Sequence, residues 1–215
     1  MQRRTFMGLG IGGLTLLGAA ALAFATMTAG KDYVALSQPL PVDSGDKVEV
    51  TEFFWYGCPH CFDLEPLMNQ WVKTLPKDVE FRRQPTIFNN ASWVPGAKIY
   101  YTLDILGELN RLHGKVFDAL HIDRVDLDKE AVLFDWMAKQ GVDRKKFADT
   151  YNSFAVQAKV KRAEQLSRQS KISGVPAVIV DGKFMTAASL TGSFESMFST
   201  LDQLIQKARS ERKAK

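Results

Sequence analysis

The residues of this sequence with the clearest chemical potential are its only two cysteines, which occur in the motif Cys58-Pro59-His60-Cys61. A strand-like run precedes the motif and a helix-like pattern follows it, so both thiols are expected on the first turn of a helix. At this spacing two thiols can close a small disulfide, and the positive end of the helix dipole favours a thiolate. The motif therefore predicts a disulfide that opens and closes.

Two other interpretations of the cysteine pair stay open. A static disulfide gains more stability by closing a long loop than a short one, so this spacing does not favour it. A zinc site would need two further ligands, for which His113 and His121 are the distant candidates. We expect these histidines at helix surfaces or helix ends instead, and we predict no metal and no cofactor besides the redox-active Cys58–Cys61 disulfide.

The position of each sulfur along the helix predicts its role. Cys58, at the N-cap, is expected to be the nucleophile, because the free N–H groups of His60 and Cys61 can point at its sulfur. Cys61 lies one turn further in, so it should be more buried and should resolve the mixed disulfide. His60 can add a donor or partial positive charge. Pro59 occupies the first turn of the helix, where proline is favoured.

The difference between the reduced and oxidised forms predicts the direction of the reaction. The helix end stabilises a thiolate, whereas the disulfide carries no charge for it to hold. Each pKa unit below the working pH therefore stabilises the dithiol by about 1.4 kcal/mol, or roughly 30 mV toward a stronger oxidant. The sequence thus predicts a protein that gives its disulfide away.

The elements that must position the cysteines follow from the periodicity of apolar residues. Residues 48–56 alternate and then form an aromatic run, which is typical of a strand that becomes fully buried in a mixed or parallel sheet. From Pro59 to Val72 the apolar residues recur at helical spacing. Residues 79–86 follow as another strand. These segments form a βαβ unit if the two strands are parallel.

The second half of the chain predicts a helical block and then a return to the sheet. Residues 97–170 are almost wholly helical in pattern. Two short strands, 177–180 and 183–186, flank the pair Asp181-Gly182, which strongly favours a tight hairpin. An amphipathic helix is expected over 194–208, followed by a charged tail, and residues 33–36 could add an edge strand.

These elements predict an α/β fold, in which a helical insertion lies beside one sheet and a narrow cleft separates the two. We expect a lead-in at 26–46, the first part of the sheet domain at 47–90, the insertion at 91–170 and the second part of the sheet domain at 171–215. The helical block is too long to be a simple crossover, which needs only about a dozen residues. It is therefore expected to form a subdomain.

Residues 1–25 have the pattern of a signal peptide. Arg3 and Arg4 precede an uncharged stretch at 8–25, which ends in the small-x-small pattern of a cleavage site after Ala25. A retained membrane anchor stays open, as does the choice between general and twin-arginine export. Either way the folded body lies outside the cytoplasm, where disulfides persist.

The charge of the chain does not favour a nucleic-acid partner. The formal net charge of +4 includes Arg3 and Arg4 of the N-terminal segment, so about +2 remains without them. Such a small excess gives no basis for predicting binding to nucleic acid.

Three motifs together make the chain resemble the DsbA-type thiol:disulfide oxidases. The resemblance covers nearly all of the chain after residue 25, and it implies a thioredoxin-like fold with an inserted all-helical subdomain. The motifs are Glu52-Phe53-Phe54 before the cysteines, Tyr151-Asn152-Ser153-Phe154 in the helical block, and Gly174-Val175-Pro176-Ala177 with the following Asp181-Gly182-Lys183.

The resemblance also implies an activity and partners. It implies a monomeric, exported protein of the periplasm that donates its disulfide to unfolded or reduced exported proteins. A membrane quinone-linked reoxidant of the DsbB type would then restore the disulfide. An isomerase or reductase of the same fold stays open, as does a redox-inactive module that binds client proteins.

Two further parts of the site are implied by the resemblance. The Val175-Pro176 peptide is expected to be cis and to face the disulfide, leaving the backbone of Val175 to pair with an extended client; an ordinary trans proline at a strand edge is the alternative. Glu52 is either on a solvent-facing edge or buried beneath the cysteines. If it is buried, it could relay the proton of Cys61, with Arg83 as counter-charge.

Overall fold

The structure is a computed structural model that describes residues 27–88 and 91–214. The expected signal segment, with its cleavage site, lies outside these residues. In the two described ranges, none of the helices combines the length and the apolar character needed to cross a membrane.

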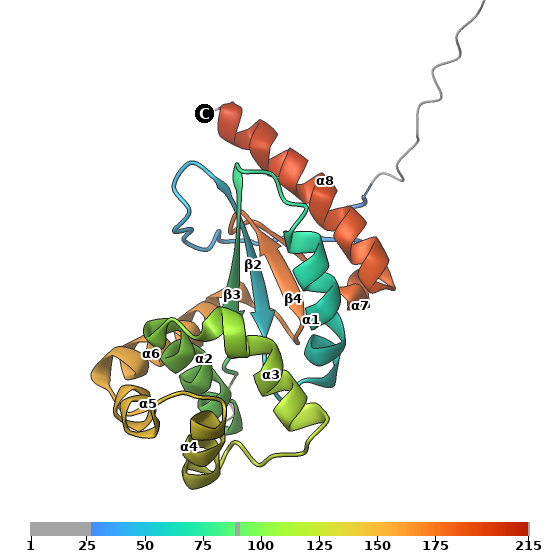
Figure 1. The fold of residues 1–215 in the computed structure, drawn as a ribbon. Coiled ribbons are helices and arrows are strands. Elements are labelled where there is room, and N and C mark those ends of the chain that lie inside the picture. The colour runs from blue at the N-terminus through green and yellow to red at the C-terminus, as the bar shows by residue number, and fades with distance from the viewer. Residues whose placement is uncertain (1–26, 89–90, 215) are drawn as a thin grey trace, which may run out of the picture.

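Five strands form one mixed sheet in the order β1-β5-β4-β2-β3 (Figure 1). β2 is parallel to β3 and antiparallel to β4, while β5 is antiparallel to both β4 and β1. The expected βαβ unit, hairpin and edge strand are therefore all confirmed. The strands are β1 (Val34–Ala35), β2 (Val48–Phe54), β3 (Val79–Pro85), β4 (Ala177–Val180) and β5 (Phe184–Thr186).

The hairpin between β4 and β5 turns at the two residues that predicted it. Asp181 and Gly182 both have positive φ, at 54° and 66°. A two-residue turn of this kind matches the twist of the flanking strands, and glycine adopts its second position without strain.

β2 is an interior strand, between β4 and β3, and its alternation decides which side chains lie beneath the active site. Val48 and Val50 face a core formed with α1 (Pro59–Val72) and α8 (Phe194–Lys213). Successive side chains of a strand point to opposite faces, so Glu52 shares the face of the two valines. A carboxyl group is thus placed on the side of the sheet that α1 covers.

Five helices form the insertion, which gathers at one end of the sheet (Figure 1). Their apolar faces build a core of their own, which also contacts both cysteines. The helical pattern predicted for 97–170 is confirmed, with a slightly earlier start and a short 3₁₀ turn, Ala91–Trp93, before it. The helices are α2 (Val94–Leu106), α3 (Leu109–His121), α4 (Glu130–Lys139), α5 (Arg144–Tyr151) and α6 (Phe154–Ser170).

α8 corrects one expectation, because the predicted charged tail is helical. The helix continues to Lys213. Arg209 binds both carboxylate oxygens of Asp78 at 2.6 and 2.7 Å, and Arg212 donates to the buried Asp181. Basic residues in the last turn also complement the helix dipole. The acidic partners of these arginines lie in the loop before β3 and in the hairpin, so the ion pairs form only in the tertiary fold.

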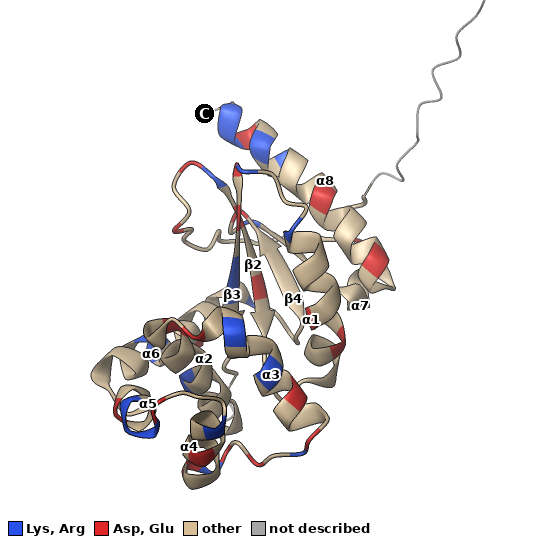
Figure 2. Cartoon of the chain, viewed as in Figure 1, with Lys and Arg blue, Asp and Glu red and all other residues tan. Residues whose placement is uncertain are grey.

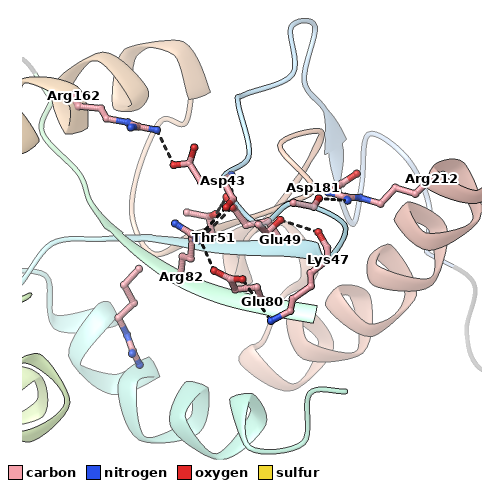
Figure 3. A network of polar contacts seen from close by, with 12 residues as sticks. Asp43, Lys47, Glu49, Thr51, Glu80, Arg82, Arg162, Asp181 and Arg212 are labelled. Carbon is pink, nitrogen blue, oxygen red and sulfur yellow. Dashed lines mark hydrogen bonds and ion pairs between the residues drawn. The ribbon is translucent and has the colours of Figure 1, made fainter. Parts of the chain in front are cut away.

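A polar network on the opposite face of β2 joins three parts of the chain (Figure 3). Glu49 accepts the backbone N–H of Asp43 and lies 3.4 Å from Arg82 Nε. Asp43 in turn pairs with Arg162 of α6 at 2.7 Å. The network therefore ties the lead-in and the insertion to the sheet. Since Asp43 and Arg162 are both exposed, their own pair contributes about 1 kcal/mol at most.

Candidate active site

The two cysteines lie where the sequence placed them, at the start of α1. Cys58 is the N-cap residue, with extended backbone angles of φ −86° and ψ 117°, and Pro59 is the first helical residue. Cys58 is 8% exposed and Cys61 is fully buried. Both are free thiols, so the structure has the geometry of the reduced form.

The electrostatics of the first turn separate the two thiols. The pKa of Cys58 is lowered to about 6. The largest cause is a hydrogen bond with Cys61; burial opposes it, while the backbone N–H groups of Cys61 and His60 and the charge of His60 add to it. Burial, followed by the interactions with Cys58, raises the pKa of Cys61 well above its ordinary value. Cys58 therefore ionises first.

The sequence predicted only part of this stabilisation. Helix N–H groups were expected to hold the thiolate, and those of His60 and Cys61 do contribute. The larger donor is the side chain of Cys61, which requires the two sulfurs to face each other. His60 is exposed beside them, as its position between the cysteines suggests.

The Val175–Pro176 loop lies against the cysteine motif. Its peptide bond is cis, so the alternative of a trans proline is wrong. The Cys58 thiol donates to the carbonyl oxygen of Val175 at 3.4 Å. Both loop residues are half-buried and β4 begins directly after them. The backbone of the loop is thus held beside the sulfur of Cys58.

A cavity of about 410 Å³, here called the active-site groove, adjoins this loop. Its lining is mainly apolar and includes His60, Val175, Pro176, Met185, Leu190 and Phe194. The active-site groove is therefore not the expected cleft between the sheet and the insertion, because apart from His60 its walls come from residues 172–194. One wall contains α7 (Ala188–Thr191), a four-residue helix that no sequence pattern predicted.

Glu52 is buried in the interior strand β2, so the alternative of a solvent-facing carboxylate is wrong. It is 1% exposed, and its Oε2 lies 3.3 Å from Arg83 Nε. Glu52 lies opposite Arg83 in the register of β2 and β3, and Figure 2 shows an acidic stretch of β2 beside a basic stretch of β3. Burial raises the pKa of Glu52 to about 7, against the lowering effect of Arg83 and with a further rise from Glu65. The charge of Glu52 also contributes to raising the pKa of Cys61.

Glu65 belongs to the same cluster and was missed from the sequence. It lies in α1, is 6% exposed, and accepts Arg83 Nη2 at 3.1 and 3.2 Å. Asn69 donates to it at 2.8 Å. The available signal was its helical phase, because it is close to Leu64 and Met68 on the buried face of α1.

The expectation of a surface role for His113 is wrong. This residue is 4% exposed, its Nε2 lies 3.4 Å from Glu65, and its Nδ1 lies 2.7 Å from the hydroxyl of Tyr56. His121 is half-buried, with Nε2 2.7 Å from the carbonyl oxygen of Tyr56. In the described part of the chain, no group of three or more His, Cys, Asp or Glu residues could hold a metal ion.

An aromatic stack lies at the base of the cysteine motif. The rings of Trp55 and Trp93 are 4.4 Å apart and nearly parallel, at 6°. Trp55 also covers Gly57, where an added Cβ would lie 2.3 Å from the indole ring. Only glycine therefore fits directly before Cys58 without displacing the stack.

Known proteins resemble this chain over most of its length. Residues 49–198 match the model of a family described as "DSBA-like thioredoxin domain". The "Thiol:disulfide interchange protein DsbA" of Bordetella parapertussis is 43% identical over 202 residues, which cover 90% of this chain and 96% of that protein. The protein of the same name from Pseudomonas aeruginosa PAO1 is 39% identical over 186 residues, or 86% and 88% of the two chains.

Solved structures show the same architecture. The crystal structure of Pseudomonas aeruginosa DsbA matches with a TM-score of 0.83 and 39% identity, covering 87% of this chain and 97% of that one. Reduced DsbA1 from Neisseria meningitidis matches with a TM-score of 0.79 and 31% identity, covering 89% and 100%. These matches confirm the expected fold class, a thioredoxin-like α/β fold with an inserted helical subdomain.

Proposed function

The chain belongs to the family of DSBA-like thioredoxin domains and is a thiol:disulfide oxidoreductase, and on that premise we propose that it works as a dithiol oxidase. It would donate the Cys58–Cys61 disulfide to reduced client proteins. The observation that carries the proposal is the unequal ionisation of the two thiols, with the pKa of Cys58 lowered to about 6 and that of Cys61 raised. The thiolate stabilises only the reduced form, so the oxidised form gives up its disulfide readily.

The proposed reaction begins when a client thiolate attacks the sulfur of Cys58. The Cys58–Cys61 bond breaks, a mixed disulfide forms between Cys58 and the client, and Cys61 leaves with the electron pair. A second client thiolate then attacks the client sulfur and releases Cys58 as a thiolate. Two electrons pass from client to protein. Of the two protons that the client thiols lose, one is taken up at Cys61 and the other goes to solvent.

Glu52 is proposed as the group that supplies the proton to Cys61. A buried carboxyl with a pKa of about 7 is half-protonated near neutral pH, which suits proton transfer in either direction. The effect of the Glu52 charge on the pKa of Cys61 supports the assignment.

Clients are proposed to bind along the loop that contains Val175 and Pro176. An extended peptide could pair with the Val175 backbone as an added strand, while its side chains enter the active-site groove. The nearness of the Val175 carbonyl to Cys58 supports this placement, since a peptide bound there would hold its thiol next to the reactive sulfur.

Export and reoxidation complete the proposal. The pattern of residues 1–25 supports export to the periplasm, with the segment removed after Ala25. There a membrane quinone-linked partner of the DsbB type would return the reduced protein to the disulfide form. The protein is proposed to act as a monomer without a bound cofactor.

Refolding of a reduced client tests the proposed function. With the disulfide form of this protein as the only oxidant, we expect disulfides to form in the client with matching loss of the Cys58–Cys61 bond, and none with Cys58→Ser. Equilibration with glutathione should give a potential well above the −270 mV or so of thioredoxin. Correction of wrong pairings without net oxidation would mark an isomerase, and no reaction at all would mark a client-binding module.

A further inference from the structure

Two buried carboxyl groups share one guanidinium beneath the cysteines. Arg83 of β3 lies between Glu52 of β2 and Glu65 of α1, at 3.3 Å from the first and 3.1 Å from the second. Burial penalises uncompensated charge. A trio with one cation is therefore most stable when one carboxyl is ionised and the other is protonated, so the two acids hold one proton between them.

The contacts of the two acids are unequal. Arg83 Nη2 donates to both oxygens of Glu65, and Asn69 adds another donor. By contrast, Oε2 of Glu52 has no hydrogen-bond partner among the described residues. Burial opposes the ionisation of Glu65, but His113 and Arg83 outweigh it and its pKa lies below the ordinary value. The anion is therefore at Glu65 and the proton at Glu52.

His113 faces the anion from the helical insertion. Burial raises the pKa of the Tyr56 hydroxyl, so this group keeps its proton and can donate it to His113 Nδ1 at 2.7 Å. Burial also lowers the pKa of His113, which leaves the ring neutral. With Nδ1 accepting, the ring proton is on Nε2, the atom 3.4 Å from Glu65 Oε2. This distance is long for a hydrogen bond, so the contact acts through the N–H dipole.

We propose that His113 is a positioning residue, whose Nε2–H makes Glu65 the anion of the buried pair and so leaves the shared proton on Glu52, on the face of the sheet that α1 covers. The inference rests on the proposed function only in assuming that Glu52 passes this proton to Cys61. It means that the helical insertion helps to set the acid of the thioredoxin-like part.

Other ionisable groups also face the cluster and must be considered in any titration. The α1–α3 cavity, of about 350 Å³, is lined by Glu65, Arg83 and His113 together with exposed residues, so solvent reaches the cluster. The ionisable and charged groups around it are Cys61 of α1, Tyr56, Tyr100 of α2, and Arg111, Lys115 and Asp118 at the cavity rim.

The proposal is tested by titrating the Glu carboxyl carbons by NMR in ¹³C-labelled, reduced protein without a client. Glu52→Gln and Glu65→Gln assign the two signals. In His113→Phe we expect the pKa of Glu52 to fall by about one unit and that of Glu65 to rise. His113→Gln places an amide N–H near the position of Nε2, so its Glu52 titration should stay close to the wild-type one.

His121→Phe is the matched control. His121 lies on the same helix and contacts the carbonyl oxygen of Tyr56 and the ring of Phe62, and among the described residues it forms no hydrogen bond or ion pair with either acid. We expect an unchanged Glu52 titration in this variant. An equal shift in His121→Phe, or failure of His113→Gln to behave better than His113→Phe, would overturn the role of the Nε2–H. So would an unchanged Glu52 titration in His113→Phe.

Glu65→Gln keeps the proposal testable if His113→Phe does not fold. Removing the competing anion leaves Arg83 to Glu52, so the pKa of Glu52 should fall by more than one unit; no fall would contradict the shared proton. The titration requires no client and no turnover. A protein that failed to oxidise clients would refute the proposed function and leave this result readable.

Discussion

The sulfur of Cys58 lies 3.4 Å from the carbonyl oxygen of Val175, although 117 positions separate the two residues. The contact joins the reactive thiol of the first half of the chain to the loop that opens β4 in the second half. It brings the thiol that ionises more readily of the two next to the backbone on which a client is proposed to lie. The helical insertion between these two segments must therefore fold in a way that keeps Cys58 in contact with the Val175 loop.

Titration of the Cys58 thiolate by its ultraviolet absorbance should give a pKa of about 6. In Cys61→Ala the largest stabilising donor is lost. We expect the pKa of Cys58 to rise in that variant, yet to stay below about 8.5 because the backbone N–H groups remain. An unchanged value in Cys61→Ala would show that the helix end alone holds the thiolate.

The stability of the reduced form relative to the oxidised form should increase with pH. The folded-state pKa of Cys58 is depressed, so its contribution is lost as pH falls through about 6 and is fully present above the unfolded value of about 8.5. Urea unfolding of both forms across this range measures the difference. Glu52 titrates in both forms, so its effect largely cancels. A difference that is flat from pH 6 to 8.5 would contradict the lowered pKa.

Glu52→Gln should slow client oxidation mainly below pH 7. There the wild-type carboxyl is protonated and can supply Cys61, whereas glutamine cannot. We expect a loss of up to about a hundredfold, at the lower end of general acid catalysis. The ratio of mutant to wild-type rates should approach one above pH 7. A ratio that does not depend on pH would exclude the proton-transfer role.

Gly57→Ala should destabilise the protein by about 1–3 kcal/mol, because the new methyl group would collide with the Trp55 ring at 2.3 Å. Urea unfolding followed by tryptophan fluorescence measures the lost stability and also reports the displacement of Trp55 from its stack with Trp93. Gly96→Ala is the matched control. Its methyl group would meet the same indole at 3.6 Å, an ordinary contact, and alanine favours the helix there. Similar losses in both variants would refute the steric explanation.

Arg83→Met should cost about 3–5 kcal/mol at pH 7, because it leaves two buried carboxyl groups without their cation. The lowered pKa of Glu65 contributes stability above its unfolded value, and this is lost on acidification. The difference in the free energy of unfolding between this variant and the wild type should therefore narrow toward pH 4. Arg162→Ala removes the exposed pair with Asp43 and should cost less than about 1 kcal/mol. Equal costs would show that burial does not set the energy of these pairs.

Features encoded within a short stretch of sequence were predictable. The Cys58-Pro59-His60-Cys61 motif carries its own helix start, and Asp181-Gly182 carries its own turn. The partners of Glu65 were not predictable, because His113 reaches it only through the packing of α3 on α1. The end of α8 depends in the same way on Asp78, which is far away in the sequence. Helical phase could still have shown that His113 is buried, since it repeats with Leu112, Val116 and Phe117.

The active-site groove and the α1–α3 cavity share no lining residue. A polypeptide that fills the first leaves the second open to water. The buried acid cluster can then exchange protons with bulk water through the α1–α3 cavity while a peptide covers the cysteines. Proton exchange therefore need not wait until the bound polypeptide dissociates.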